Sequence, residues 1–112
     1  MDMAKAKRTT VWLYPADLQA IERIRARWGL GSDSDAVRLA LRILAASGAH
    51  LEPTTKEGES SLFTLWRFPE DREAIETLSR GELNDADVVR AAIRLLAKSK
   101  LIAIQEEDDE SA

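Results

Sequence analysis

The sequence predicts a mainly helical protein in which one strand-helix-helix unit occurs twice. Residues 10–26 return as residues 64–80 at an offset of 54, with seven identities in 17 positions. Residues 32–47 return as residues 84–99 at an offset of 52, with nine identities in 16 positions. The two-residue difference falls in the turn between the two helices of each unit, where changes in length are tolerated. We therefore expect two related halves joined by a linker.

Each unit begins with a predicted strand followed by a helix. The segments 9–14 and 62–68 are rich in β-branched and aromatic residues, as strands are. A proline ends each strand and suits the first turn of a helix. An aspartate two residues later is favourable at a helix start, and a glycine marks the expected helix end. In the two units these residues are Pro15, Asp17 and Gly29, and Pro69, Asp71 and Gly81.

A second helix follows in each unit. Ser32 precedes the first of these helices and Asn84 the second, each with an aspartate at capping-box spacing. Gly48 ends the first, and the second is expected to run to about Ile104. Apolar residues predict one buried side, namely Val37, Ala40, Leu41 and Leu44, and Val89, Ala92, Ile93 and Leu96. The opposite side carries two arginines one turn apart, which more often mark a solvated face than a DNA contact: Arg38 and Arg42, and Arg90 and Arg94.

The chain therefore divides into five predicted segments. A basic N-terminal arm spans residues 1–8, the first unit 9–47, a surface linker 48–61, the second unit 62–104 and an acidic, disordered tail 105–112. The net charge of −4 is unevenly spread, with +3 up to residue 51, −2 from there to residue 104, and −5 in the tail. Without the tail the charge is near +1, which does not by itself indicate a nucleic-acid binder.

The composition argues against several classes of protein. There is no cysteine, and the only histidine, His50, falls in the linker, so we expect neither disulfides nor a metal site. The Asp-x-Asp runs at the helix starts lack the further ligands of a calcium loop. We identify no nucleophile with a base beside it, and predict neither an enzyme nor a cofactor. No apolar run approaches the roughly 20 residues that span a membrane, so the expected location is the cytoplasm.

A short strand, a proline-led helix, a glycine turn and a capped apolar helix resemble the ribbon-helix-helix (Arc- and MetJ-type) family. The resemblance covers nearly the whole chain twice, apart from the linker and the two ends. It implies two tandem ribbon-helix-helix units whose strands form a two-stranded antiparallel β-ribbon over interlocked helices. The expected form is a pseudo-dimer paired within one chain. Pairing between two chains, and a larger homo-oligomer, stay open.

The resemblance implies a DNA-binding protein, a transcriptional regulator such as a repressor, with its ribbon in the major groove of double-stranded DNA. In that family the residue before the first helix points into the core, which places Tyr14 and Phe68 inside together with Trp12 and Trp66. The residues expected to face the groove are then Thr9, Val11, Leu13, Phe63, Leu65 and Arg67.

Phosphate contacts are the second implication. In the family a phosphate lies at the start of the second helix, where free backbone N–H groups bind anions. A basic arm before the first strand is a further candidate for phosphate binding. The expected residues are Ser32, Ser34 and Asn84 at the helix starts, and Lys5, Lys7 and Arg8 in the arm. Aspartates beside both helix starts are expected to repel a phosphate.

A second function stays open. Only Arg67 and Thr9 in the expected groove-facing set carry hydrogen-bond donors, and the others offer apolar contact alone. An exposed apolar patch often marks a protein interface. The alternative is an antitoxin-like or partner-binding assembly module that has lost the groove contacts, with a protein partner on the apolar face of the ribbon.

Overall fold

The computed structural model describes residues 7–99, and six elements follow one another along this part of the chain. The first half consists of β1 (Lys7–Leu13), α1 (Pro15–Trp28) and α2 (Asp33–Ser47), and the second of β2 (Ser61–Arg67), α3 (Pro69–Ser79) and α4 (Asp85–Lys98). Helix α4 ends before the predicted position, and residues 100–104 and the acidic tail lie outside the described range. Within that range, no helix has both the length and the apolar character needed to cross a membrane.

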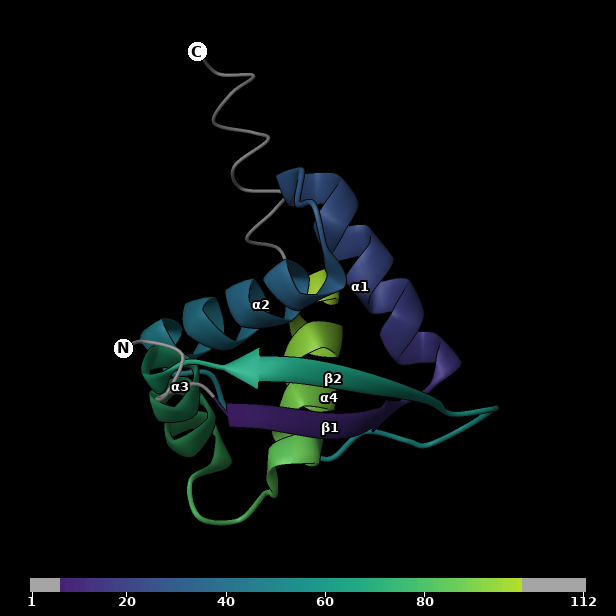
Figure 1. The fold of residues 1–112 in the computed structure, drawn as a ribbon. Helices are drawn as coiled ribbons and strands as arrows, with labels where there is room; N and C mark the ends of the chain where they lie inside the picture. Colours follow the sequence, from purple (N-terminus) through teal and green to yellow (C-terminus); the bar gives the residue numbers. More distant parts are fainter. Residues whose placement is uncertain (1–6, 100–112) are drawn as a thin grey trace.

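Strands β1 and β2 lie side by side and antiparallel, and form a two-stranded ribbon (Figure 1). Thr10 pairs with Thr64 at its middle. An isolated two-stranded sheet is only marginally stable in water, so the ribbon depends on the helices that it contacts. Helix α4 passes behind the strands in Figure 1 and contacts β1.

One expectation from the sequence needs correction. The chain is not a tandem of two ribbon-helix-helix units, because the described residues contain one two-stranded sheet and therefore one ribbon. Each half supplies one strand, and buried residues from both strands and all four helices form one core. A lone strand leaves its backbone groups unpaired, and a lone helix pair leaves an apolar face uncovered. The chain is a single, mainly helical unit whose halves complete each other.

The helices pack across the two halves. Helix α1 contacts α4, and α2 contacts α3, so each second helix covers the first helix of the other half. Helices α2 and α4 also contact each other. The local signals at the helix starts act as the sequence indicates: the side chains of Ser32 and Asn84 each accept the backbone N–H three residues later, at 3.1 and 2.8 Å.

Two fully buried carboxylates, Asp17 and Asp71, fix the turn from strand to helix in each half. Asp17 Oδ2 accepts the backbone N–H of Tyr14 at 2.8 Å. Asp71 Oδ2 accepts that of Phe68 at 2.9 Å. A buried carboxylate is costly unless its charge is also paired, and a single N–H does not supply that charge.

The charge comes from the other half of the chain. Arg94 Nε of α4 donates to Asp17 Oδ1 at 2.6 Å, and Arg42 Nε of α2 donates to Asp71 Oδ1 at 3.0 Å. We call these four residues the carboxylate clamp. The expected solvated face is wrong for Arg94, whose side chain is 14% exposed. Arg42 remains 45% exposed, but its guanidinium is also bound to a buried carboxylate. The partner lies 77 or 29 residues away in the sequence.

The other two arginines hold the ribbon itself. Both strands of a two-stranded ribbon are edge strands, whose outward carbonyls need partners. Arg90 Nη1 donates to the carbonyl of Trp12 at 2.9 Å, and Arg38 Nη2 donates to that of Trp66 at 2.7 Å. Each arginine belongs to the half opposite the strand that it binds. The solvated face expected for Arg38 and Arg90 is therefore also corrected.

The segment between α2 and β2 is docked rather than a plain surface linker. Leu51 is 5% exposed and belongs to the core, and the hydroxyl of Thr55 accepts a hydrogen bond from Arg94 at 3.3 Å. Gly58 has a φ of +93°, and a Cβ there would lie 2.9 Å from Cγ of Pro15. Only glycine suits both the conformation and the close approach.

The carboxylate clamp predicts a large loss of stability when one partner is removed. Asp17→Ala should lower the free energy of unfolding by about 3–5 kcal/mol, because it leaves the largely buried Arg94 without its counter-charge. Glu70→Ala is the control, because it removes a carboxylate that also pairs with an arginine of the clamp, at 3.4 Å from Arg42, but is 70% exposed. Its effect on the free energy of unfolding should stay within about 0.5 kcal/mol. Urea unfolding measures both. Similar small losses for the two variants would contradict the role given to the clamp.

Candidate nucleic-acid interface

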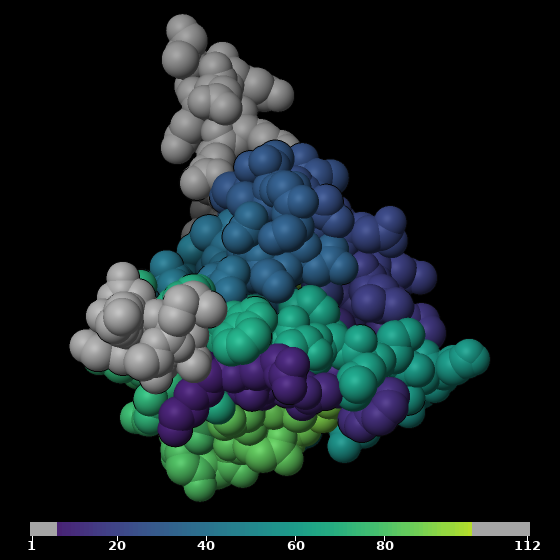
Figure 2. All heavy atoms as spheres, in the orientation of Figure 1, coloured from purple at the N-terminus to yellow at the C-terminus, as the bar shows by residue number. Residues whose placement is uncertain are grey.

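The ribbon presents one face to the core and one to solvent, because successive side chains of a strand point to opposite sides. We call the solvent side the outer face. All of its side chains are exposed, and they are Arg8, Thr10, Trp12, Leu62, Thr64 and Trp66. Figure 2 shows both strands at the surface, β1 in purple and β2 in teal, with the helices to the sides and behind.

Three cross-strand pairs make up the outer face. Two hydroxyls meet in the middle, where Thr10 pairs with Thr64. Arg8 and Trp66 form one flanking pair, with the guanidinium carbon 5.9 Å from the ring centroid. Trp12 and Leu62 form the other, and their side chains are 53% and 57% exposed. The face thus combines hydrogen-bonding groups, one cation and broad apolar surfaces.

The face of the strands that the family resemblance predicts to point outward is the one that faces the core in the structure. Val11, Leu13 and Leu65 are 1%, 0% and 0% exposed, so they face the core and not a DNA groove. Thr9 and Phe63 lie half-buried on the same inner side. The two tryptophans expected inside lie on the outer face instead.

Tyr14 and Phe68 explain the difference. The resemblance predicts them as inward residues, but each is the N-cap of a helix, half-buried with an arginine over its ring. Arg90 lies 5.9 Å from the ring centroid of Tyr14, and Arg38 lies 5.2 Å from that of Phe68. The core-facing residue is one position earlier, at Leu13. The alternation of polar Arg8, Thr10 and Thr64 with aliphatic neighbours carried the correct signal.

Arg67, the only arginine in the expected groove-facing set, does not lie on the outer face. Its side chain is 18% exposed, and Nη1 donates to Asp85 at the start of α4 at 2.6 Å. The charge of Arg67 is therefore matched within the fold. Arg8 is the arginine that the ribbon turns outward.

The other candidates for phosphate binding have mixed positions. Ser32 and Asn84 use their side chains as helix caps, and Ser34 is half-buried. The adjacent aspartates are not bare negative charges, since Asp33 binds Arg25 at 2.9 Å, as Asp85 binds Arg67. The helix starts are thus less repulsive to a phosphate than the sequence suggested.

The basic arm is described only from its seventh residue onward. Lys7 is exposed as the first residue of β1 and lies opposite Arg67 in the register. Arg8 belongs to the outer face and is exposed there. Lys5 lies outside the described residues.

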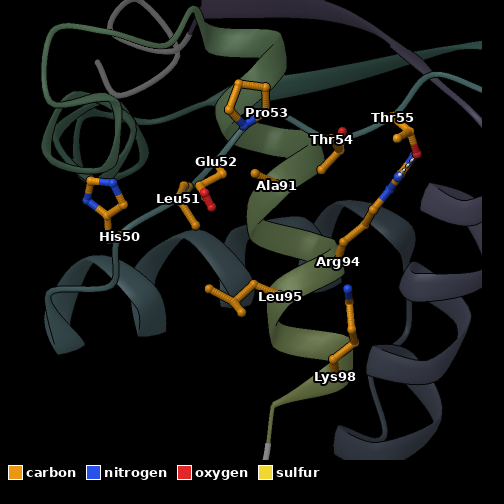
Figure 3. Close-up of a pocket in the computed structure, with 10 residues that line it drawn as sticks. All are labelled: His50, Leu51, Glu52, Pro53, Thr54, Thr55, Ala91, Arg94, Leu95 and Lys98. Carbon is orange, nitrogen blue, oxygen red and sulfur yellow. Dashed lines mark hydrogen bonds between the residues drawn. The ribbon is translucent and has the colours of Figure 1, made fainter.

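An open pocket of about 410 Å³ lies away from the ribbon, between the segment after α2 and helix α4 (Figure 3). Arg94 crosses it to reach Thr55, and Lys98 lies one turn further along α4. His50 is exposed at its edge. Arg94 is already bound to Asp17, so its charge is not free to bind a ligand in this pocket. No group of histidine, cysteine, aspartate or glutamate suited to a metal occurs in residues 7–99.

No family model, curated protein or solved structure matches the chain. The ribbon and the residues that hold it are therefore the features that bear on function. The sequence resemblance to the ribbon-helix-helix family remains an inference from the motifs quoted above.

Substitution of two neighbouring residues of β2 tests which face of the strand points to the core. Leu65→Ala should destabilise the protein by about 2–5 kcal/mol, because it empties a fully buried position. Trp66→Ala should cost less than half as much, although it removes more atoms, since Trp66 is 44% exposed. Urea unfolding of the two variants compares them directly. A larger loss for Trp66→Ala would contradict this orientation.

Proposed function

We propose that the chain binds double-stranded DNA, as a regulator of transcription, by laying the outer face of its ribbon in the major groove. The observation that carries the proposal is a two-stranded ribbon whose outer face is left uncovered by the helices of residues 7–99 and has hydrogen-bonding side chains along it. The major groove is about 12 Å wide and admits a two-stranded ribbon. The resemblance to the ribbon-helix-helix family supports the same function.

The outer face has suitable chemistry for reading bases. Arg8 can donate two hydrogen bonds to O6 and N7 of a guanine, and the central hydroxyls of Thr10 and Thr64 can donate to or accept from base edges. Trp12 and Leu62 offer apolar contact to the methyl group of thymine. Lys7 adds a positive charge at the ribbon end, which supports phosphate binding.

The arginines behind the ribbon support this function because they hold the strands in place. Arg38 and Arg90 fix the carbonyls of Trp66 and Trp12, so the strands are held before any ligand arrives. A ribbon already ordered in its binding conformation loses less conformational freedom on association. The same contacts hold the outer side chains at defined spacing.

A second candidate is a protein-interaction module, which the exposed Trp12, Leu62 and Trp66 favour. Tryptophan is enriched among the residues that contribute most to protein interfaces. Exposed apolar side chains of this size often mark a binding site. The partner on that surface would be a second protein or a second copy of the chain.

Two arginines distinguish base contact from general attraction. Arg8→Ala should lower affinity for a preferred duplex by about 1–3 kcal/mol, because it removes the donor pair for guanine. Arg23→Ala removes the same charge from α1, beside Ala97 and Lys98 and away from the ribbon, and should act weakly and mainly at low salt. Fluorescence anisotropy at two salt concentrations measures both. Equal losses would count against contact through the outer face.

The two candidate functions differ in their response to Trp12→Lys combined with Trp66→Lys. If the ribbon reads DNA, the variant protein should keep the wild-type mass in solution. It should also bind random DNA more tightly, because two positive charges are added. A protein interface should lose its assembly, because the apolar contact becomes charged. Light scattering and DNA titration of this one variant give both answers. Lost assembly without a gain in DNA affinity would favour the second candidate over the proposed function.

A further inference from the structure

The two ends of the outer face differ, although the fold beneath them repeats. At the offset of 54, Thr10 corresponds to Thr64 and Trp12 to Trp66, so these positions are identical in the two halves. Arg8 corresponds to Leu62. The register then gives each end one tryptophan, with Arg8 as its cross-strand partner at one end and Leu62 at the other.

The neighbouring pairs extend this difference. Beyond Arg8, the ribbon ends in Lys7 opposite Arg67. Beyond Leu62, it ends in Leu13 opposite Ser61. One end therefore carries the exposed cations Lys7 and Arg8, since Arg67 is paired with Asp85. The other end carries no charged side chain within the strands.

The scaffold below does not share this difference. Arg94 and Asp17 match Arg42 and Asp71 in the carboxylate clamp, and the strand carbonyls are held by the matching Arg90 and Arg38. The two ends of the outer face are thus presented in equivalent ways with different chemistry.

We propose that the chain recognises a non-palindromic DNA duplex in one fixed orientation. This inference rests on the proposed function and names the class of its ligand: a site with guanine where Arg8 lies and thymine where Leu62 lies. Arg8 can bind O6 and N7 of guanine together, whereas Leu62 has no donor and suits the thymine methyl. Rotating the ribbon by 180° on the same duplex would exchange the positions of Arg8 and Leu62. Arg8 would then face the thymine and Leu62 the guanine.

The position of Arg8 supports such discrimination. Its guanidinium lies over the ring of Trp66, 5.9 Å from the centroid, where a cation is attracted to the aromatic face. This contact restricts the long side chain before DNA is bound. The planar guanidinium retains edge donors that match a guanine.

The test compares the DNA sequences selected by three proteins from a random pool of short duplexes, about one to two helical turns long. The wild-type protein should select an asymmetric motif, with guanine at one end and thymine at the other. Leu62→Arg should select guanine at both ends, one on each strand, and Arg8→Leu should select thymine at both ends. Exchanging the selected guanine for adenine should weaken wild-type binding about tenfold.

Controls separate a failed inference from a failed fold or function. Positions 8 and 62 are exposed, and circular dichroism verifies that each variant keeps its helices. Arg23→Leu makes the same kind of substitution away from the ribbon and should leave the motif unchanged. A palindromic wild-type motif, or one motif shared by the wild-type protein and Leu62→Arg, overturns the fixed orientation but not DNA binding. Failure of all three proteins to retain any motif overturns the proposed function and this inference with it.

Discussion

The fold depends on two buried carboxylates that each half places and only the other half can neutralise. Asp17 and Asp71 cap their own helices with one oxygen and bind an arginine of the opposite half with the other. Removing a charge from water costs several kcal/mol unless a counter-charge meets it. The strand-to-helix turn, the helix crossing and the position of the strands are therefore set together. The open ribbon is a product of that arrangement.

The sequence predicts the local elements well, because their signals lie within a few residues. Pro15 starts α1, Ser32 caps α2, and the apolar side of each second helix is buried. Long-range partners are less visible. The spacing of Arg42 and Arg94 suits an exposed helix face as well as a clamp, and only the fold brings them to the aspartates. Each half likewise contains a strand, but its residues alone do not show which strand pairs with it.

The candidate site shows how a small error in phase changes every residue of a strand. Because side chains alternate, a shift of one position exchanges the inner and outer faces completely. An inward Tyr14 exchanges Val11 with Trp12, and an inward Phe68 exchanges Leu65 with Trp66. Residue size does not indicate the orientation either, since the large tryptophans are outside and the smaller aliphatic residues inside. The positions of Ser32 and Asn84 at the helix starts do not depend on the phase of the strands, because local capping fixes them.

The docked linker has a consequence for how the protein behaves at low abundance. Two halves joined by a short segment meet at an effective concentration in the millimolar range, whatever the concentration of the protein. Leu51 and Gly58 restrict that segment further by packing on the core and on Pro15. A ribbon built from two separate chains comes apart on dilution. This one stays assembled even when a cell holds a single copy.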